Sequence, residues 1–120
     1  MKWVIRIIQG LLVAGFAAFG LMKLTGNEMQ VQTFEALGFP LGFMYFVGIC
    51  EIAGTLGLLA GFWKKNIAVL ASGGLVLLML GAAISHLMAG QGMGVAMPAL
   101  VFFLLSLVVF LGKRADKLRN

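Results

Sequence analysis

The sequence predicts an all-α protein: an antiparallel four-helix transmembrane bundle with a short interfacial helix between helices one and two. Of the 120 residues, 62% are hydrophobic and 11% are charged, whereas soluble domains average about 25% charged residues. A chain this short cannot bury so much apolar surface in a core of its own. The stretch from Asn66 to Gly112 contains no Asp, Glu, Lys or Arg, and as helix it would cross a hydrocarbon layer of about 30 Å twice. We therefore expect one membrane domain over residues 1–120.

The predicted spans cover residues 3–24, 41–62, 67–89 and 95–112. The first begins with Trp3 and Arg6, an aromatic and a basic side chain that are typical of the membrane interface. The 63–66 turn is short enough to make the second and third spans antiparallel neighbours. Pro98 falls in the first turn of the fourth span, where a helix tolerates proline.

The polar segment over residues 25–40 predicts the interfacial helix. Thr25 and Glu28 have the spacing of a capping box, in which two side chains satisfy unpaired N–H groups at the start of a helix. Gly38 is placed to end this helix, and Pro40 follows where it can no longer continue. We expect this helix to lie in the membrane interface or over the open outer end of the bundle. Its apolar face consists of Met29, Phe34 and Leu37.

The net charge of +5 lies at the ends of the spans and forms no basic patch with interleaved aromatic residues, so we expect the lipid bilayer as partner and no nucleic acid. With four crossings, eight of the nine basic residues fall on one side: Lys2, Arg6, Lys64, Lys65, Lys113, Arg114, Lys117 and Arg119. Only Lys23 departs from this pattern. The positive-inside rule then predicts a multi-pass protein of a bacterial-type inner (plasma) membrane, with both termini cytoplasmic.

The first twenty residues also have the basic start and small-residue end of a cleavable signal peptide. Cleavage would leave three spans and place the C-terminal basic tail opposite Lys64 and Lys65, against the charge rule. The charge pattern therefore favours a retained first span.

Three ionisable residues, Lys23, Glu51 and His86, fall within or at the ends of the spans. A charge near the bilayer centre costs at least about 2.5–3.5 kcal/mol on insertion scales, so such residues face the bundle interior and find partners. We expect an outward-facing polar pocket with Lys23 and His86 at its rim and Glu51 at its floor. Further ligand-binding candidates are Thr55, on the same helix face as Glu51, and Ser85, which precedes His86.

The depths of these residues argue against a tight triad. Glu51 is about 15 Å into its span, whereas His86 is only about 5 Å below the surface. A later start of the second helix, or a Lys23 side chain that reaches inward, would close the gap.

Each of the three residues also has a purely structural interpretation. Lys23 could be a snorkelling interface lysine, and His86 an interfacial histidine bonded to Ser85, a backbone carbonyl or water. Glu51 could be a neutral buried carboxyl, or a partner of Lys23 that only holds the helices in register.

No other chemistry-bearing constellation is present in the sequence. One histidine cannot supply bis-histidine haem ligation, and no cluster offers three or four metal ligands. We therefore predict no metal site and no covalently bound cofactor, and the catalytic residues, if the protein is an enzyme, are unknown. The lone Cys50 has no partner for an internal disulfide. Small-xxx-small pairs at Gly38/Gly42 and Gly57/Gly61 predict close helix packing, either within the bundle or at a homo-oligomer seam.

Three stretches resemble the DoxX-like family of small four-helix membrane proteins: GLMKLTG at Gly20–Gly26, the segment Ala36–Leu59, and LGAAISHL at Leu80–Leu87. The family marks are Lys in G-x-x-K-L-x-G, Glu in G-x-x-E-x-x-G and His after a Gly-Ala pair. They correspond to Lys23, Glu51 and His86.

The resemblance implies a role as an accessory to other membrane proteins. DoxX itself is described as a subunit of a thiosulfate:quinone oxidoreductase, related proteins are linked to membrane oxidoreductase complexes, and distant eukaryotic relatives act as chaperones of neurotransmitter-gated receptors. With one cysteine and no redox motif, this chain could not carry electrons without a bound quinone or a partner protein. We expect an accessory protein whose pocket binds a small amphipathic ligand of quinone or lipid type, as a subunit of a membrane oxidoreductase. The alternatives are an assembly factor or chaperone that acts through helix contacts, and a proton-coupled small-solute transporter that uses Glu51.

Overall fold

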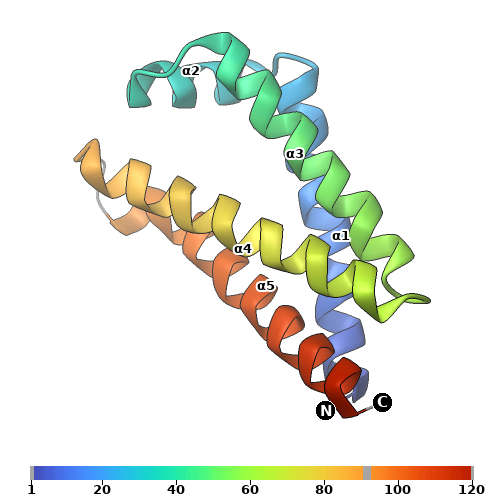
Figure 1. The fold of residues 1–120 in the computed structure, drawn as a ribbon. Helices are drawn as coiled ribbons and strands as arrows, with labels where there is room; N and C mark the ends of the chain where they lie inside the picture. The colour runs from blue at the N-terminus through green and yellow to red at the C-terminus, as the bar shows by residue number, and fades with distance from the viewer. Residues whose placement is uncertain (1, 91–92, 120) are drawn as a thin grey trace.

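The computed structural model describes residues 2–90 and 93–119, and the elements in these ranges are all helices. They are α1 (Lys2–Leu24), α2 (Glu28–Leu37), α3 (Leu41–Ala60), α4 (Lys65–Met88) and α5 (Met93–Arg119), as Figure 1 shows. The four helices α1, α3, α4 and α5 are long and apolar enough to cross a membrane. The predicted all-α, four-span architecture is confirmed.

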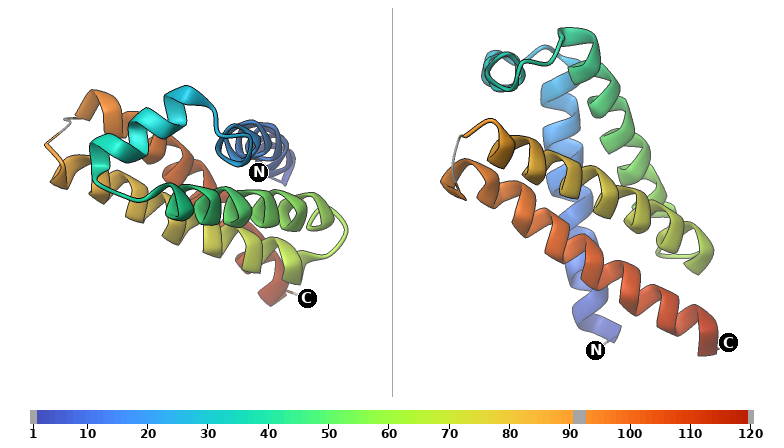
Figure 2. Two further views of the ribbon diagram at one scale, coloured as in Figure 1. Left: turned by 90° about the horizontal axis from the view of Figure 1, so that it is seen from above. Right: turned by 60° about the vertical axis from the view of Figure 1, so that its left-hand side comes forward.

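The long helices form two antiparallel pairs that cross each other. α1 lies against α3, and α4 lies against α5 (Figures 1 and 2). The pairs are close together at the end that carries both termini and separate toward the other end, where α2 lies across the opening. This divergence leaves space beneath α2.

The main core lies where the two pairs meet. Its buried members are Leu12, Phe16, Leu58, Leu75, Met79 and Val109. Gln9 is fully buried beside them, and its Nε2 donates to the Leu58 carbonyl at 2.6 Å. That carbonyl is available because α3 tightens at its end, where the Phe62 N–H bonds to Leu59. The bond satisfies a carbonyl that the helix end would otherwise leave without a partner.

Glycines bring α3 and α4 into close contact. A Cβ built on Gly57 would lie 2.7 Å from the Ala71 Cβ, and one on Gly61 would lie 2.6 Å from the Ala68 Cβ. The Gly57/Gly61 pair therefore packs within the bundle. Gly38 instead ends α2 with a φ of +79°, and so is not part of a packing seam on α3.

Substituting Gly57 with Ala is expected to lower the free energy of unfolding by about 1–3 kcal/mol, because the added methyl overpacks the contact with Ala71. Thermal denaturation in detergent micelles would measure the change as a fall in Tm. The control is Gly74→Ala on α4, which meets nothing within 4 Å and should leave the Tm unchanged or slightly higher. Equal effects of the two substitutions would show that the α3–α4 contact is not tight.

The predicted capping box is wrong. Asn27 caps α2 by accepting a bond from the Met29 N–H at 3.0 Å, whereas the Thr25 hydroxyl bonds back to the Leu21 carbonyl of α1. The physical reason is the turn at Gly26, whose φ of +69° takes the chain out of α1 and delays the start of α2.

The predicted apolar face of this helix is also wrong in one member. Phe34 is buried, but Met29 is 70% exposed. Residues five apart point about 140° apart around a helix of 3.6 residues per turn, so these two cannot share one face.

The fourth span differs most from its prediction. α5 begins at Met93 and runs to Arg119, so the basic stretch expected as a tail continues the helix, and Pro98 lies in the second turn and not in the first. Lys65 at the start of α4 forms a half-exposed ion pair with Asp116 at 3.3 Å, so this extension lies beside the start of α4. Of the outer loop predicted at 90–94, residues 91 and 92 lie outside the described residues.

Candidate functional site

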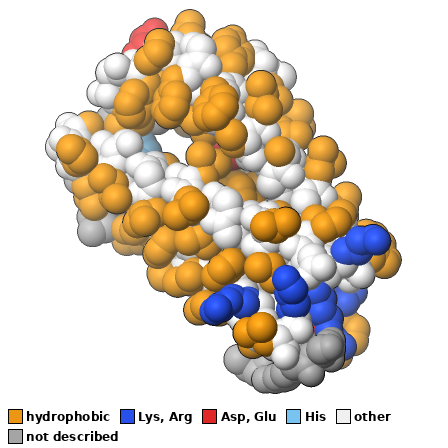
Figure 3. Space-filling model, viewed as in Figure 1, with side chains coloured by type: hydrophobic (Ala, Val, Ile, Leu, Met, Phe, Trp, Pro, Cys, Tyr) orange, Lys and Arg blue, Asp and Glu red, His pale blue; other side chains and the backbone are white. Residues whose placement is uncertain are grey.

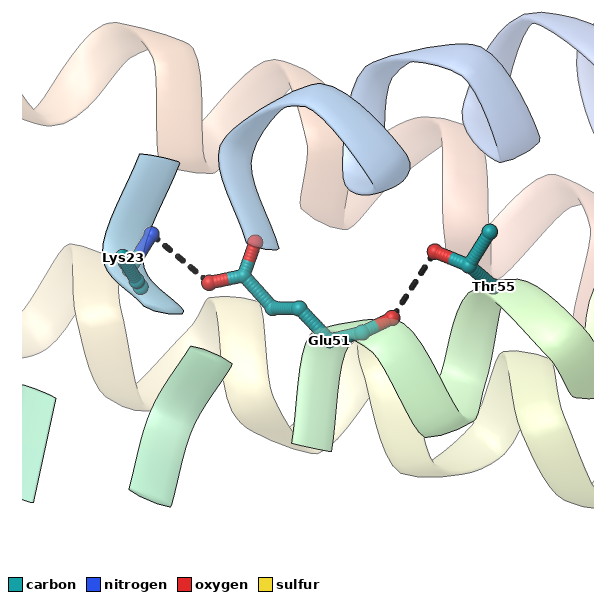
Figure 4. A network of polar contacts seen from close by, with 3 residues as sticks. All are labelled: Lys23, Glu51 and Thr55. Carbon is teal, nitrogen blue, oxygen red and sulfur yellow. Dashed lines mark hydrogen bonds and ion pairs between the residues drawn. The ribbon is translucent and has the colours of Figure 1, made fainter. Parts of the chain in front are cut away.

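A buried ion pair joins α1 to α3 beneath α2. The Lys23 Nζ, in the last turn of α1, lies 2.7 Å from the Glu51 Oε1 of α3 (Figure 4). Lys23 is 9% exposed and Glu51 is 1% exposed. Lys23 therefore does not snorkel to the surface and is not at the rim as predicted, because its side chain reaches inward to the carboxylate. This inward reach brings the Lys23 ammonium into direct contact with the Glu51 carboxylate.

The glycines of the two motifs explain why the pair can form. A Cβ built on Gly48 of α3 would lie 2.9 Å from the Lys23 Cβ. Reciprocally, a Cβ built on Gly20 of α1 would lie 3.4 Å from the Glu51 Cβ and 2.8 Å from the Ile52 side chain. Each glycine thus provides the flat surface on which the stem of the other helix's charged residue rests.

The hydroxyl candidates Thr55 and Ser85 are both used by their own helices. Thr55 Oγ1 donates to the Glu51 backbone carbonyl at 2.8 Å, as Figure 4 shows, and Ser85 Oγ donates to the Gly81 carbonyl at 2.8 Å. Thr55 is buried next to the ion pair but lines neither of the cavities described below, whereas Ser85 lines one of them.

Two cavities meet at the ion pair. One of about 270 Å³ lies between α2, α3 and α4, and another of about 310 Å³ lies between α1, α2, α4 and α5. Figure 3 shows the hollow beneath α2 from one side. The residues that line both cavities are Lys23, Gln30, Thr33, Glu51, Met79, Ala82 and His86. The structure thus brings all three ionisable residues to one space, with Lys23 and Glu51 in direct contact.

The walls of this space become apolar away from the ion pair. The first cavity continues along Phe34, Phe43 and Leu77, and the second continues along Phe19, Pro98 and Phe102. Its centre offers an ammonium, a carboxylate, an imidazole, an amide and a hydroxyl. Within the described residues, no three His, Cys, Asp or Glu side chains are grouped to hold a metal ion. The chemistry that the site supports is hydrogen bonding and proton exchange with a molecule that is largely apolar.

Gln30 and Thr33 are pocket residues that the sequence reasoning missed. Both lie on α2 and line both cavities. The signal for them is their i, i+3 spacing, which places two polar side chains on one face of a short helix. That spacing does not say which way the face turns, since this depends on how α2 docks over the opening.

Comparisons with known proteins bear on the family of the chain. The sequence profile described as the DoxX-like family matches residues 7–109, a range that includes Lys23, Glu51 and His86. "Uncharacterized protein YdgD" from Bacillus subtilis (strain 168) is 33% identical over 96 residues, which is 79% of this chain and 84% of the relative. No solved structure matches the chain.

Proposed function

Since this chain belongs to the DoxX-like family of small membrane proteins, we propose that it is an accessory integral membrane protein that binds a small amphipathic ligand of quinone or lipid type beneath α2. The observation that carries this proposal is the buried Lys23–Glu51 pair at the junction of two largely apolar cavities. A polar centre with apolar walls on either side complements a molecule that has a polar head and an apolar body.

The energetics of the ion pair support a role beyond stability. Removing two charges from water costs several kcal/mol, and well-packed hydrophobic residues often replace a buried pair without loss of stability. Lys23 and Glu51 face the cavities, where a ligand oxygen can accept from the ammonium and a ligand hydroxyl can donate to the carboxylate. Gln30 adds an amide that can orient the head from the α2 side, and the Thr33 hydroxyl, which donates to the Met29 carbonyl at 2.8 Å, can still accept a hydrogen bond there.

The apolar continuations of the two cavities favour entry of the ligand from the lipid phase. They run between the two helix pairs, along Phe43 and Leu77 on one side and Phe19 and Phe102 on the other. A lipid-soluble molecule could move along these walls while its head exchanges hydrogen bonds at the centre. As a subunit of a membrane oxidoreductase, the protein would hold a quinone for a partner that supplies the electrons.

The charge distribution supports a bacterial-type inner (plasma) membrane with both termini cytoplasmic. Lys and Arg side chains gather at the end of the molecule that carries the termini, as Figure 3 shows, and α2 lies at the opposite end. In this orientation the ligand site lies in the outer half of the membrane.

The structure favours this function over the two alternatives. An assembly factor that recognises partners through Gly57 and Gly61 is disfavoured, because α4 of the same chain already packs against both glycines. Proton-coupled transport needs a path to the other side, whereas the core around Leu58 and Leu75 fills the bundle toward the termini. Both features favour a binding pocket that is closed on the side of the termini.

We expect Glu51→Gln to weaken the binding of a short-tailed quinol, ubiquinol-1, by about 10- to 100-fold, because the quinol hydroxyl donates to the charged carboxylate and such a hydrogen bond contributes roughly 1.5–3 kcal/mol. Equilibrium dialysis of the detergent-purified protein would measure the affinity. The matched control is Glu35→Gln on the exposed face of α2, which should bind as the wild type does. Unchanged binding by Glu51→Gln, or an equal loss in both variants, would contradict the quinone form of the proposal. The same dialysis with a lysophospholipid would test whether the site binds a lipid instead.

A further inference from the structure

A second charged site lies at the opposite end of the molecule from the cavity. Lys113 of α5 is only 8% exposed and forms no ion pair or hydrogen bond among the described residues. Its electrostatic neighbours are Arg6, Asp116, Lys65 and Lys2, of which Asp116 is already bound to Lys65. We propose that this cluster, which we call the basic site, binds the phosphate group of an anionic membrane lipid.

The basic site carries an excess of positive charge. The stem of Lys113 is buried, the charges that act on its ammonium are mainly like charges from α1 and α4, and Asp116, the carboxylate among them, is already paired with Lys65. The start of α4 adds further positive character, because its N-cap residue Lys64 makes no capping bond and its first turn has no acidic residue. A phosphate diester would supply both a negative charge and several acceptor oxygens.

The level of the basic site in the membrane identifies a lipid as the source of the phosphate. Trp3 and Trp63 are 75% and 78% exposed at this end of the molecule, as is typical of side chains at the lipid headgroups. The Arg6 guanidinium lies over the rings of Trp3 and Phe62, at 5.8 Å and 5.3 Å from their centroids. The site thus lies at headgroup depth near the starts of α1 and α4, where clustered basic side chains attract anionic lipids.

The two tryptophans of the chain make the proposal measurable. Lipids brominated on their acyl chains quench the fluorescence of Trp3 and Trp63, and the protein would be titrated in mixed micelles with brominated phosphatidylglycerol or brominated phosphatidylcholine. We expect the wild type to prefer phosphatidylglycerol by about fivefold or more. Lys113→Met should abolish this preference, whereas Lys117→Met, which removes the same charge from an exposed position of α5, should retain most of it.

Each other outcome of this experiment decides against the proposal. Equal losses in the Lys113→Met and Lys117→Met proteins would show diffuse attraction to the basic end of the molecule and no defined site. Displacement of the brominated lipid by excess inorganic phosphate would assign the site to a soluble anion. If the Lys113→Met protein does not fold, Arg6→Gln takes its place, and retention of the full preference by that variant would overturn the proposal.

Discussion

Replacing Glu51 with Leu is expected to lower the free energy of unfolding by about 3–5 kcal/mol, because the Lys23 ammonium is left buried without its partner. Lys23→Met should have an effect of similar size for the converse reason. The double variant Lys23→Met/Glu51→Leu removes both charges and should recover most of the stability of the wild type. Thermal or chemical unfolding of the four proteins in bicelles would give the coupling energy as a double-mutant cycle.

This cycle separates the structural role of the ion pair from its role in binding. We expect the double variant to be stable and yet unable to bind ubiquinol-1, because the polar centre of the cavity is gone. If the pair only held α1 and α3 in register, the stable double variant would bind as well as the wild type. Single substitutions without any cost in stability would contradict the burial of the pair.

Replacing Gly48 with Leu is expected to cost about 3 kcal/mol or more, since overpacking at a helix contact forces backbone shifts. Its Cβ would lie 2.9 Å from the Lys23 Cβ and 3.2 Å from the Leu24 side chain, so α1 and α3 must separate. The separation would lengthen the distance between the Lys23 Nζ and the Glu51 Oε1. A fall in Tm and a loss of ubiquinol-1 binding should therefore occur together.

Gly42→Leu is the matched control for this substitution. Gly42 lies on the same helix, is exposed and meets nothing within 4 Å, so a side chain there extends into lipid. The control should keep both the Tm and the binding of the wild type. Similar losses at both positions would mean that the effect comes from replacing a glycine in α3 and not from its contact with Lys23.

The bilayer makes the four spans, and a shared polar cavity for Lys23 and Glu51, predictable from the sequence. Hydropathy reports the spans directly, because each helix must match the same hydrocarbon thickness. Lys23 and Glu51 could be expected to share a cavity because neither can face lipid without a partner. Their direct contact could not be derived, since it depends on the close approach of α1 and α3 at Gly20 and Gly48.

Features that depend on local turns and on docking were not predictable in this way. The capping-box spacing at Thr25 and Glu28 is a common pattern, and the turn at Gly26 decides that Asn27 is the cap instead. The orientation of Gln30 toward the cavity depends on how α2 docks. Lys113 belonged to a stretch predicted as a tail, and only the extension of α5 shows that its side chain is buried.

The most direct test of the account fills the cavity without changing a charge. Ala82 lines both cavities, and Ala82→Phe would place a ring at their junction. Ala53→Phe makes the same change on the exposed face of α3. Mass spectrometry of organic extracts from gently purified protein should find a stoichiometric lipid-soluble molecule in the wild type and in Ala53→Phe, but not in Ala82→Phe. The same amount in the Ala82→Phe protein, or none in the wild type, would contradict the claim that this cavity holds a ligand.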